Sequence, residues 1–505
     1  MKLRRLLEGA GLRSGTGIPE VDVTQVAYDS REVGPGGVFV CVSGLHKDGY
    51  EFVREAVSRG TVAVVLDRDM PVEGAVRVLV PDARVALASL ACQFYGHPSR
   101  RLKLVGITGT NGKTTVSYLV KAICTEAGLR VGVLGTIGFK FGDVDLKGSH
   151  TTPEAPEFQG LLARMVGEGI THAAVEVSSH ALAMRRSYGT EFDAVVFTNL
   201  SRDHLDFHGT FEEYKRAKLK LFVDEERGVG EKRKPFAILN QDDPAFSEFA
   251  QAARENIVTY GTSEAAQVRA TQVEVLPEGS IFHVLWSGED LQVRLSLSGA
   301  FNVTNALAAF AVGVSLGLEA HQVVRGIQSV RGVKGRLERV HKGQSFSVFV
   351  DYAHTPDALS NVLKTARPIT EGDLICVFGC GGDRDRGKRS QMGRVSGELA
   401  DYTVITSDNP RSENPLAIIA QIEEGIRGAN ARYVVIPDRR EAIGHALGTA
   451  KPADSVLIAG KGHEDYQVLG DRTVHFDDVE VAEEVLLRQV QGDSSGRAPS
   501  QKGST

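Results

Sequence analysis

Apolar and polar positions along the chain follow two different spacings, which predict strands and helices. Short apolar runs recur between residues 100 and 334, among them "KLVGIT", "HAAVEVS", "DAVVFTN" and "PFAILN", and such runs are typical of buried strands. The segments between them carry apolar residues on one side of a helix. In "VSYLVKAICTEAG", that side holds Val116, Leu119, Val120 and Ile123. Strands that alternate with helices in this way predict a mostly parallel sheet covered by helices.

The same patterns divide the chain into three α/β domains and a tail. Residues 1–99 hold short strands and one clear helix, "DARVALASLACQFYG", and predict a small α/β domain. Residues 100–334 predict the central domain, with antiparallel strands inserted over 255–298 before the helix "NVTNALAAFAVGVSLG". Residues 335–490 repeat the strand–helix alternation and predict a C-terminal, Rossmann-like sheet. Residues 491–505 are polar and predict a disordered tail.

Composition and charge narrow the class of protein. A content of 42% apolar and 24% charged residues is typical of soluble globular proteins, and a net charge of −6 does not favour nucleic acid as a partner. The chain has no long apolar stretch and a short apolar part at its basic start, so we expect neither membrane insertion nor a signal peptide. Five cysteines without a CxxC pair argue against a disulfide framework and a structural zinc, and favour the cytoplasm.

A glycine-rich stretch, "GITGTNGKTT", joins a predicted strand to a predicted helix at residues 106–115. Gly109 and Gly112 would let the backbone approach a phosphate, Lys113 offers a point charge, and Thr114 offers a hydroxyl to Mg²⁺. The strict Walker A pattern fails, because Ile107 stands where that pattern requires glycine. A turn that only links strand and helix is the alternative; we expect a phosphate-binding loop.

The form "TGTNGKTT" resembles the ATP-binding loop of the Mur ligase family, whose members join amino acids to the cytoplasmic peptidoglycan precursor. Folylpolyglutamate synthases share a similar loop. Further segments resemble motifs of the Mur ligase family, in the family's order: "EVSSHAL" at 176–182, "NLSRDHLDFHGT" at 199–210, "YKRAKLKLF" at 214–222, "DYAHTPDAL" at 351–359 and "FGCGGDRDRGKR" at 378–389. The resemblance extends from about residue 25 to 485.

The resemblance implies that ATP and Mg²⁺ are bound in the central domain. Glu176 and His204 each follow an apolar strand, where parallel sheets place their ligand-binding groups. Taken alone, Glu176 could equally be a structural carboxylate, and the His204–His208 pair lacks an HExxH zinc pattern. The resemblance implies that Thr114, Glu176 and His204 are Mg²⁺ ligands. The nucleotide contacts that it implies are Gly109, Thr110, Asn111, Gly112, Lys113, Thr114, Thr115, Asn302, Arg336, Asp351 and His354.

Lys218 is a special case. By charge pattern, "EEYKRAKLKLF" is a helix with a solvated basic face. In the Mur ligase family the lysine of the AKxxLF pattern carries a carbamate that helps to hold a second Mg²⁺. The resemblance therefore implies a carbamate on Lys218 and makes it, with Lys113 and His204, one of three expected catalytic residues.

The resemblance also implies where the precursor binds. "YDSREVGPGGVFVCVSG" resembles the segment that binds the uridine diphosphate, with Ser30 as the candidate contact. "HTTPE" and "SSH" resemble the positions that hold the muramoyl-dipeptide, and Met184 stands where the family often has glutamine. The dipeptide contacts carried over are Thr151, Thr152, Ser178 and Arg186.

The segment "SDNPRSENP" at 407–415 points to the added amino acid. In the family, the form DNPR is that of members that add meso-diaminopimelate, which differs from lysine by one more carboxylate. Arg411 could grip that carboxylate with two parallel hydrogen bonds, and would be left unpaired by lysine. The expected contacts are Arg384, Asp408, Asn409, Pro410, Arg411, Gly460 and Glu464. NAD is not expected, since Arg384 stands where a GxGxxG pattern requires glycine.

Together these features predict an ATP-dependent ligase of the cytoplasm, which we expect to be a monomer with small-molecule partners only. The resemblance implies that it adds meso-diaminopimelate to UDP-N-acetylmuramoyl-L-alanyl-D-glutamate. An L-lysine-adding Mur ligase, a folylpolyglutamate synthase-like ligase and a catalytically silent nucleotide-binding protein are the alternatives.

Overall fold

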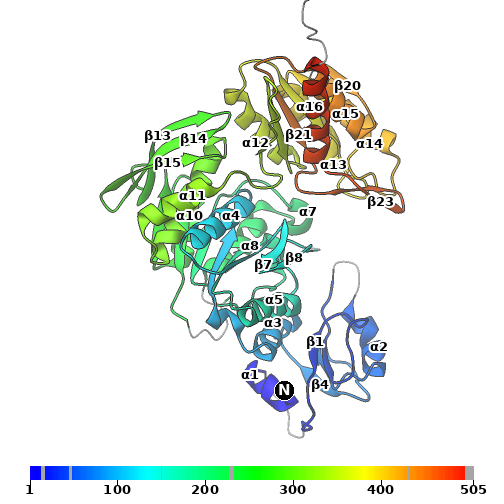
Figure 1. The fold of residues 1–505 in the computed structure, drawn as a ribbon. Helices are drawn as coiled ribbons and strands as arrows, with labels where there is room; N and C mark the ends of the chain where they lie inside the picture. Colours follow the sequence, from blue (N-terminus) through cyan, green and yellow to red (C-terminus); the bar gives the residue numbers. More distant parts are fainter. Residues whose placement is uncertain are drawn as a thin grey trace, which may run out of the picture. The chain divides into compact units, whose positions relative to one another are not determined.

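The computed structural model describes residues 1–12, 18–44, 48–148, 150–223, 226, 232–429 and 431–494. They form two compact units (Figure 1). The first, here the N-terminal unit, comprises Met1–Thr271, Val284–Leu291 and Thr304–Ser329. The second, the C-terminal unit, comprises Gln272–His283, Gln292–Val303 and Val330–Thr505, as far as these are described.

The first sheet of the N-terminal unit has four parallel strands in the order β1-β2-β3-β4. They are β1 (Gln25–Ala27), β2 (Gly37–Val40), β3 (Ala63–Leu66) and β4 (Val76–Leu79). The predicted helix is α3 (Ala83–Phe94), which begins where the Asp82 carboxylate accepts the backbone N–H groups of Arg84 and Val85. Two further helices, α1 (Leu3–Gly9) and α2 (Val53–Ser58), were not predicted, because each spans too few turns to show a helical period.

The second sheet has eleven strands in the order β15-β14-β13-β12-β11-β10-β5-β9-β6-β7-β8. Its first half in the chain comprises β5 (Lys103–Thr108), β6 (Val131–Gly135), β7 (Gly138–Phe141), β8 (Val144–Leu146), β9 (His172–Glu176) and β10 (Ala194–Phe197). Its second half comprises β11 (Phe236–Asn240), β12 (Ile257–Gly261), β13 (Val268–Leu276), β14 (Gly279–Trp286) and β15 (Glu289–Leu295). The predicted strands at its centre pair in parallel, with β5 between β10 and β9.

The stretch 255–298, expected to hold inserted antiparallel strands, extends this same sheet. The expectation is wrong for its first strand, β12, which pairs in parallel with β11. β13 pairs in parallel with β12, with Tyr260 opposite Val268. β14 and β15 follow it through connections of two residues, which join antiparallel strands. The helices of this region are α4 (Lys113–Glu126), α5 (Ala155–Gly167), α6 (Ser179–Ala183), α7 (Leu205–His208), α8 (Phe211–Leu219), α9 (Phe246–Ala253), α10 (Ala300–Ser315) and α11 (Ala320–Ser329), with 3₁₀ turns η2 (Pro98–Arg101) and η3 (Lys220–Phe222). The four apolar residues predicted for α4 are all buried.

The C-terminal unit holds a six-stranded sheet in the order β16-β17-β21-β18-β19-β20, parallel except for β16. Its strands are β16 (Glu338–Arg339), β17 (Ser347–Asp351), β18 (Leu374–Phe378), β19 (Tyr402–Ile405), β20 (Tyr433–Val435) and β21 (Ser455–Ala459). Its helices are α12 (Pro356–Ala366), α13 (Gly387–Leu399), α14 (Pro415–Arg427), α15 (Arg439–Thr449) and α16 (Asp478–Ser494), with the turn η5 (Arg367–Ile369). A hairpin of β22 (Tyr466–Leu469) and β23 (Arg472–His475) follows β21. The three sheets confirm the predicted α/β class.

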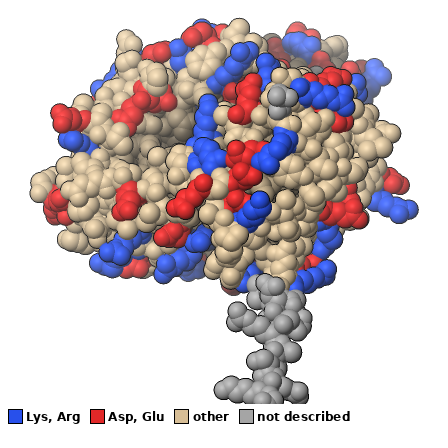
Figure 2. All heavy atoms as spheres, turned by 90° about the horizontal axis from the view of Figure 1, so that it is seen from above, with Lys and Arg blue, Asp and Glu red and all other residues tan. Residues whose placement is uncertain are grey.

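Three further expectations can be compared with the structure. Helix α16 continues through Ser494, four residues into the expected disordered tail, and residues 495–505 lie outside the described part. All five cysteines are described, and each is a buried free thiol. Among the helices described, none is both long and apolar enough to cross a membrane. On the face seen in Figure 2, Lys and Arg are interspersed with Asp and Glu.

Candidate active site

The glycine-rich stretch is a tight loop between β5 and α4. Gly109 has φ 147° and Gly112 has φ 86°, a backbone region that favours glycine. A Cβ atom at Gly109 would lie 1.9 Å from Thr198 Oγ1, and one at Gly112 would lie 2.3 Å from Asn305 Oδ1. The close packing therefore allows no side chain at either position. Helix α4 begins directly after Gly112, and the N-terminus of a helix, with its positive dipole end, is a site that can receive a phosphate.

The loop is anchored to the end of the neighbouring strand, β10. The N–H of Asn111 donates to Asn199 Oδ1 over 2.9 Å, and Thr198 Oγ1 donates to the Asn111 carbonyl over 2.6 Å. Thr110 Oγ1 donates to the Ser201 carbonyl and lies 3.0 Å from the hydroxyl of Tyr214. Sequence reasoning did not select these anchors, although "FTN" at the end of a strand was the available signal. Thr115 is buried in the first turn of α4.

Two lysine ammonium groups meet at one carbonyl oxygen of this loop. Lys113 Nζ donates to the Gly109 carbonyl over 2.9 Å, and Lys218 Nζ donates to the same oxygen over 2.7 Å. Lys218 is only 1% exposed, so the interpretation of a solvated basic face is wrong for this residue. Burial, and then the charge of Lys113, lower the pKa of Lys218 well below its ordinary value, against the opposing effect of Asp203.

Glu176, at the end of β9, is buried beside the loop. Its Oε2 accepts hydrogen bonds from Thr114 Oγ1 over 3.0 Å and from Thr136 Oγ1 over 2.9 Å, and its Oε1 accepts the Thr136 N–H over 3.0 Å. Thr136 was not predicted, since no motif marks it. A carboxylate and a hydroxyl side by side are hard oxygen donors, which fit Mg²⁺.

His204 lies in the loop between β10 and α7, at φ 53° and with its side chain 43% exposed. Burial is the main cause that lowers the pKa of the ring, and this favours the neutral form, which can offer a lone pair to a metal. Its ring centroid lies 4.7 Å from that of His180. In the parts of the chain that the structure describes, no three His, Cys, Asp or Glu side chains are grouped as metal ligands, so His204 is not joined to Glu176 in such a group.

The residues expected to hold the dipeptide continue from Glu176. Thr152 Oγ1 donates to the Glu176 carbonyl over 2.8 Å and accepts the Ser178 N–H over 3.1 Å. Thr151 Oγ1 lies 3.1 Å from Thr136 Oγ1. Arg186 donates to the Thr152 carbonyl over 3.0 Å and pairs with Glu154 at 2.8 Å.

Ser30 lies in the turn after the first strand of the four-stranded sheet. It follows β1 and is buried, and its hydroxyl donates to Glu55 Oε2 over 3.0 Å. That hydroxyl is therefore already oriented by a carboxylate from α2.

The other predicted nucleotide contacts belong to the C-terminal unit. The Asp351 carboxylate accepts the N–H groups of Leu337 and Ala353 at 2.7 and 2.8 Å, and burial raises its pKa. The guanidinium of Arg336 lies 5.2 Å from the ring centroid of Tyr352, and His354 Nδ1 lies 2.9 Å from the Tyr352 carbonyl. Asn302 Nδ2 donates to the Ser298 carbonyl over 2.8 Å, near the start of α10.

The segment from Asp408 to Arg411 follows β19 and is joined to the loop after β18. Arg411, at φ 51°, donates through Nη1 to the Gly382 carbonyl over 2.8 Å, and the Gly382 N–H donates to the Asn409 carbonyl over 2.9 Å. Arg384 is exposed in the same loop and donates to the Asp383 carbonyl. Pro410 is buried. These two loops bring both predicted guanidinium-bearing residues into contact with one glycine, Gly381, where a Cβ would lie 2.8 Å from Arg411 Nη1 and 3.8 Å from Arg384 Cγ.

A third loop, after β21, completes this cluster. Asn409 Nδ2 donates to Glu464 Oε2 over 2.9 Å, and a Cβ at Gly460 would lie 2.8 Å from Asp408 Oδ2. Lys461, fully buried, donates to the same Glu464 oxygen over 3.2 Å. Sequence reasoning missed Lys461, although it stands between two predicted residues in "GKGHEDYQ". All seven amino-acid-binding candidates therefore lie on three neighbouring loops of one sheet.

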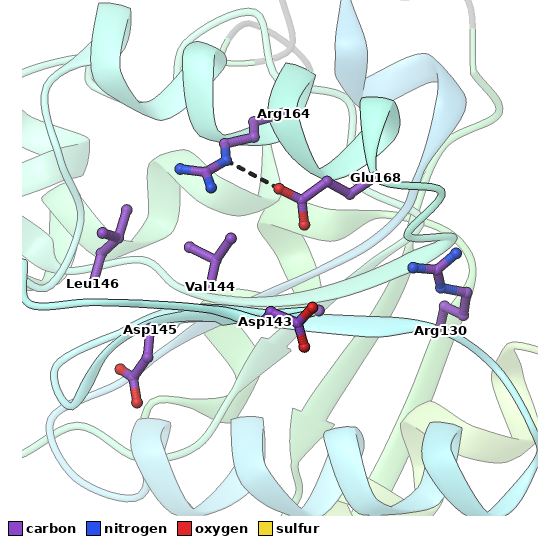
Figure 3. A pocket seen from close by; sticks show the side chains of 8 residues that line it. Arg130, Asp143, Val144, Asp145, Leu146, Arg164 and Glu168 are labelled. Atoms are coloured by element: carbon purple, nitrogen blue, oxygen red, sulfur yellow. Dashed lines mark hydrogen bonds and ion pairs between the residues drawn. The ribbon is translucent and has the colours of Figure 1, made fainter.

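A pocket of about 570 Å³ lies elsewhere, at the β8 edge of the eleven-stranded sheet (Figure 3). It is lined by Arg130, Gly142, Asp143, Val144, Asp145, Leu146, Arg164 and Glu168. Arg164 Nε donates to Glu168 Oε1 over 3.0 Å within it (Figure 3). It contains none of the predicted site residues.

Comparison with known protein families shows to which family the chain belongs. The description "Mur ligase middle domain" matches residues 107–313, "Mur ligase, glutamate ligase domain" matches 335–462, and "Mur ligase family, catalytic domain" matches 22–95. The chain belongs to the Mur ligase family. The resemblance deduced from the motifs is thereby confirmed.

Relatives within the Mur ligases match nearly the whole chain. The UDP-N-acetylmuramoyl-L-alanyl-D-glutamate–2,6-diaminopimelate ligase of Bacillus licheniformis is 44% identical, over 96% of this chain and 99% of its own. The ligase of the same name from Caldanaerobacter subterraneus subsp. tengcongensis is 45% identical over the same shares. A solved structure with that ligase's name matches 97% of this chain and 100% of its own, with 32% identity and a TM-score of 0.70.

Proposed function

We propose that this Mur ligase adds meso-2,6-diaminopimelate to UDP-N-acetylmuramoyl-L-alanyl-D-glutamate at the expense of ATP, in the synthesis of the peptidoglycan precursor. The observation that carries the proposal is the cluster of Arg411, Asn409 and Glu464, in which a guanidinium and a carboxylate are held on adjoining loops. Relatives that bear the name of this reaction, at 44% and 45% identity, support it.

The cluster suits the far end of a diamino acid that carries both a carboxylate and an ammonium group. Arg411 would receive the carboxylate with two parallel hydrogen bonds, and Arg384 would add a second guanidinium. Glu464 and Asp408 would receive the ammonium. L-Lysine has no carboxylate at that end, so it would leave Arg411 unpaired, and this penalty would favour diaminopimelate.

The loop at Gly109–Thr115 would bind the ATP phosphates. The N-terminus of α4 would face the phosphates, and Lys113 would turn from the loop carbonyls to the γ-phosphate. The carboxylate of the precursor's glutamate would attack the γ-phosphorus while the bond to ADP breaks, which gives an acyl phosphate. The amine of diaminopimelate would then attack the acyl carbon, lose a proton and expel phosphate.

Thr114 and Glu176, which lie side by side, would hold Mg²⁺, and His204 would be a Mg²⁺ ligand at its own position in the loop after β10. The ion would neutralise charge on the phosphates. We propose that Lys218 carries a carbamate and holds a second Mg²⁺. The structure favours this chemistry in one respect, because only a neutral amine reacts with carbon dioxide and the pKa of Lys218 is lowered.

Thr151, Thr152, Ser178 and Arg186 would position the dipeptide, next to Glu176. Ser30 would contact the uridine diphosphate on the first sheet. Asn302, Arg336, Asp351 and His354 would contact the nucleotide. We expect the enzyme to act in the cytoplasm and to be a monomer. Light scattering of the purified chain can test the oligomeric state.

The test is phosphate release and amide formation by the purified chain with ATP, Mg²⁺ and the precursor, comparing meso-diaminopimelate with L-lysine. We expect efficient product formation with diaminopimelate only. Equal use of L-lysine would contradict the substrate assignment, and folate-dependent turnover would favour the folylpolyglutamate synthase-like alternative. Absence of any new amide bond with all three reactants would contradict the proposed reaction.

A further inference from the structure

Two loops of the C-terminal unit carry most of the residues proposed to bind the diamino acid. The first, residues 379–386, joins β18 to α13, and the second, residues 406–414, joins β19 to α14. Besides the bonds of Gly382, the Ser412 hydroxyl and N–H donate to the Asp383 carboxylate at 2.7 and 3.1 Å. The position of Arg411 thus depends on how these two loops are held against each other.

An ion pair joins the fully buried Arg389 to Glu413, whose side chain is 14% exposed. Arg389 comes from α13, and its Nη2 and Nη1 donate to the two carboxylate oxygens of Glu413 at 2.8 and 3.0 Å. This is the bidentate geometry in which arginine is most specific for a carboxylate. Glu413 belongs to the second loop, just after Arg411, so the pair ties α13 to that loop.

The same two side chains also hold the first loop. Arg389 Nη2 donates to the Gly381 carbonyl over 3.2 Å, and Glu413 Oε1 accepts the Asp383 N–H over 2.7 Å. Arg389 Nη1 donates in addition to Gln421 Oε1 on α14 over 3.0 Å. Gly381 is the residue that packs against the Arg411 guanidinium, with room for no Cβ between them. The buried guanidinium of Arg389, a residue of α13, therefore contacts both loops and, through Gln421, also α14.

Glu413 stays ionised over the working pH range. Its hydrogen bonds from Arg389 and from the Asp383 N–H lower its pKa to about 2. Arginine is charged at every relevant pH. The ion pair is therefore charged on both sides at neutral pH.

We propose that Arg389 and Glu413 are positioning residues that set the orientation of Arg411 and thereby the selection of a diamino acid with a carboxylate at its far end. This inference rests on the proposed function. A positioning role predicts a different result from a merely structural one. A displaced Arg411 would weaken the binding of diaminopimelate, and it would leave the binding of L-lysine, which has no carboxylate at that end, nearly unaffected.

The test compares wild type with Arg389→Lys and Glu413→Gln. Lysine keeps the charge without the planar pair of donors, and glutamine keeps an acceptor for the Asp383 N–H without the charge. In steady-state kinetics we expect the KM for meso-diaminopimelate to rise about tenfold or more, with the KM for ATP and for the precursor within about twofold. The ratio of kcat/KM for diaminopimelate to that for L-lysine should fall by a similar factor.

Arg367→Gln is the matched control in the same unit. Arg367 also pairs with a carboxylate, that of Asp401 at 2.6 Å, and also donates to two carbonyls, those of Thr370 and Gly372. It contacts neither loop in the bonds described, so its removal should leave the substrate ratio unchanged even where it lowers the unfolding temperature.

A second control asks whether Arg389 acts through Arg411. In the double variant Arg389→Lys, Arg411→Ala, the loss of the substrate ratio should equal that of Arg411→Ala alone, because nothing remains to be positioned. If Arg389→Lys does not fold, Glu413→Gln with Arg411→Ala decides in its place. An unchanged substrate ratio in a folded variant overturns the inference, and so do additive losses. A wild-type chain that forms no amide with diaminopimelate instead contradicts the proposed function itself.

Discussion

Lys218 donates a hydrogen bond to the carbonyl oxygen of Gly109 over 2.7 Å, although the two residues lie 109 positions apart in the chain. The contact places a buried amine against the glycine-rich loop between β5 and α4. Burial and the neighbouring Lys113 lower the pKa of Lys218, so a larger fraction of the amine is neutral at pH 7. This is the form that reacts with carbon dioxide.

We therefore predict that ligation depends on dissolved carbon dioxide. Activity should fall in degassed, bicarbonate-free buffer and return on addition of bicarbonate, and Lys218→Ala should lose at least about a hundredfold in kcat and show no such dependence. Phosphate release measures both. Lys215→Ala is the control, because Lys215 in the same helix pairs with Glu212 and Glu248 and its pKa is raised. A Lys218→Ala enzyme with ordinary turnover would remove this residue from the catalytic set.

The second prediction concerns the shape of the loop. Gly109→Ala should abolish ATP-dependent turnover and lower stability by about 1–3 kcal/mol, because the new Cβ meets Thr198 Oγ1 at 1.9 Å and the backbone is held at positive φ. Gly128→Ala is the matched control: Gly128 also has positive φ, 72°, but no atom lies within 4 Å of its added Cβ. It should cost some stability and leave turnover intact. Thermal unfolding and an ATPase assay separate the two effects, and equal turnover in both variants would contradict a role of Gly109 in phosphate binding.

Local patterns were sufficient to predict the α/β fold and the tight glycine-rich loop between β5 and α4. The strand β5, the glycine-rich loop and the helix α4 follow one another directly in the chain. The spacing of apolar residues and the turn residues therefore describe one short segment and predict it together. The continuation of one sheet through β13 to β15 was not predicted, because pairing between β12 and β13 leaves no signal in either strand's own pattern. The helices α1 and α2 were missed because they are too short for the helical spacing of apolar residues to be recognised.

The site was less predictable where it depends on distant contacts. The charge pattern of "YKRAKLKLF" does not distinguish the buried Lys218 from the paired Lys215. Only the resemblance to the family's AKxxLF pattern singled out Lys218 in the sequence. Thr136 holds Glu176, and Arg389 holds Glu413, without belonging to a recognisable pattern. Which residues orient other side chains depends on three-dimensional contacts, and a single sequence does not show these contacts.

The third prediction tests the proposed substrate. Arg411→Ala should lower the preference for meso-diaminopimelate over L-lysine by about ten- to a hundredfold, the range expected for losing a charged hydrogen-bonding partner. A competition assay with both amino acids and product analysis by mass measures the ratio. Arg427→Ala is the control, since Arg427 is a surface arginine of α14 whose partner is Glu423 at 3.2 Å. An unchanged preference would exclude Arg411 from this role.

The fourth prediction concerns acid stability and His463, which packs against Tyr352 with ring centroids 4.7 Å apart. Burial, followed by the charges of Arg336 and Lys334, lowers the pKa of His463 to about 4. The unfolded chain therefore binds a proton at this residue below its ordinary pKa of 6.5, while the folded chain does not. Stability should fall as the pH falls from about 6.5 to about 4.

His463→Gln should reduce this loss, by roughly 1–3 kcal/mol between pH 7 and pH 4.5, as measured by thermal unfolding of the full chain. His475→Gln provides a control of opposite sign, because Glu480, 2.6 Å away, raises the pKa of the exposed His475. That pair stabilises the protein at low pH and loses its effect as the pH rises, so its removal should make the fall on acidification steeper. Parallel pH profiles for wild type and both variants would show that neither histidine governs acid stability.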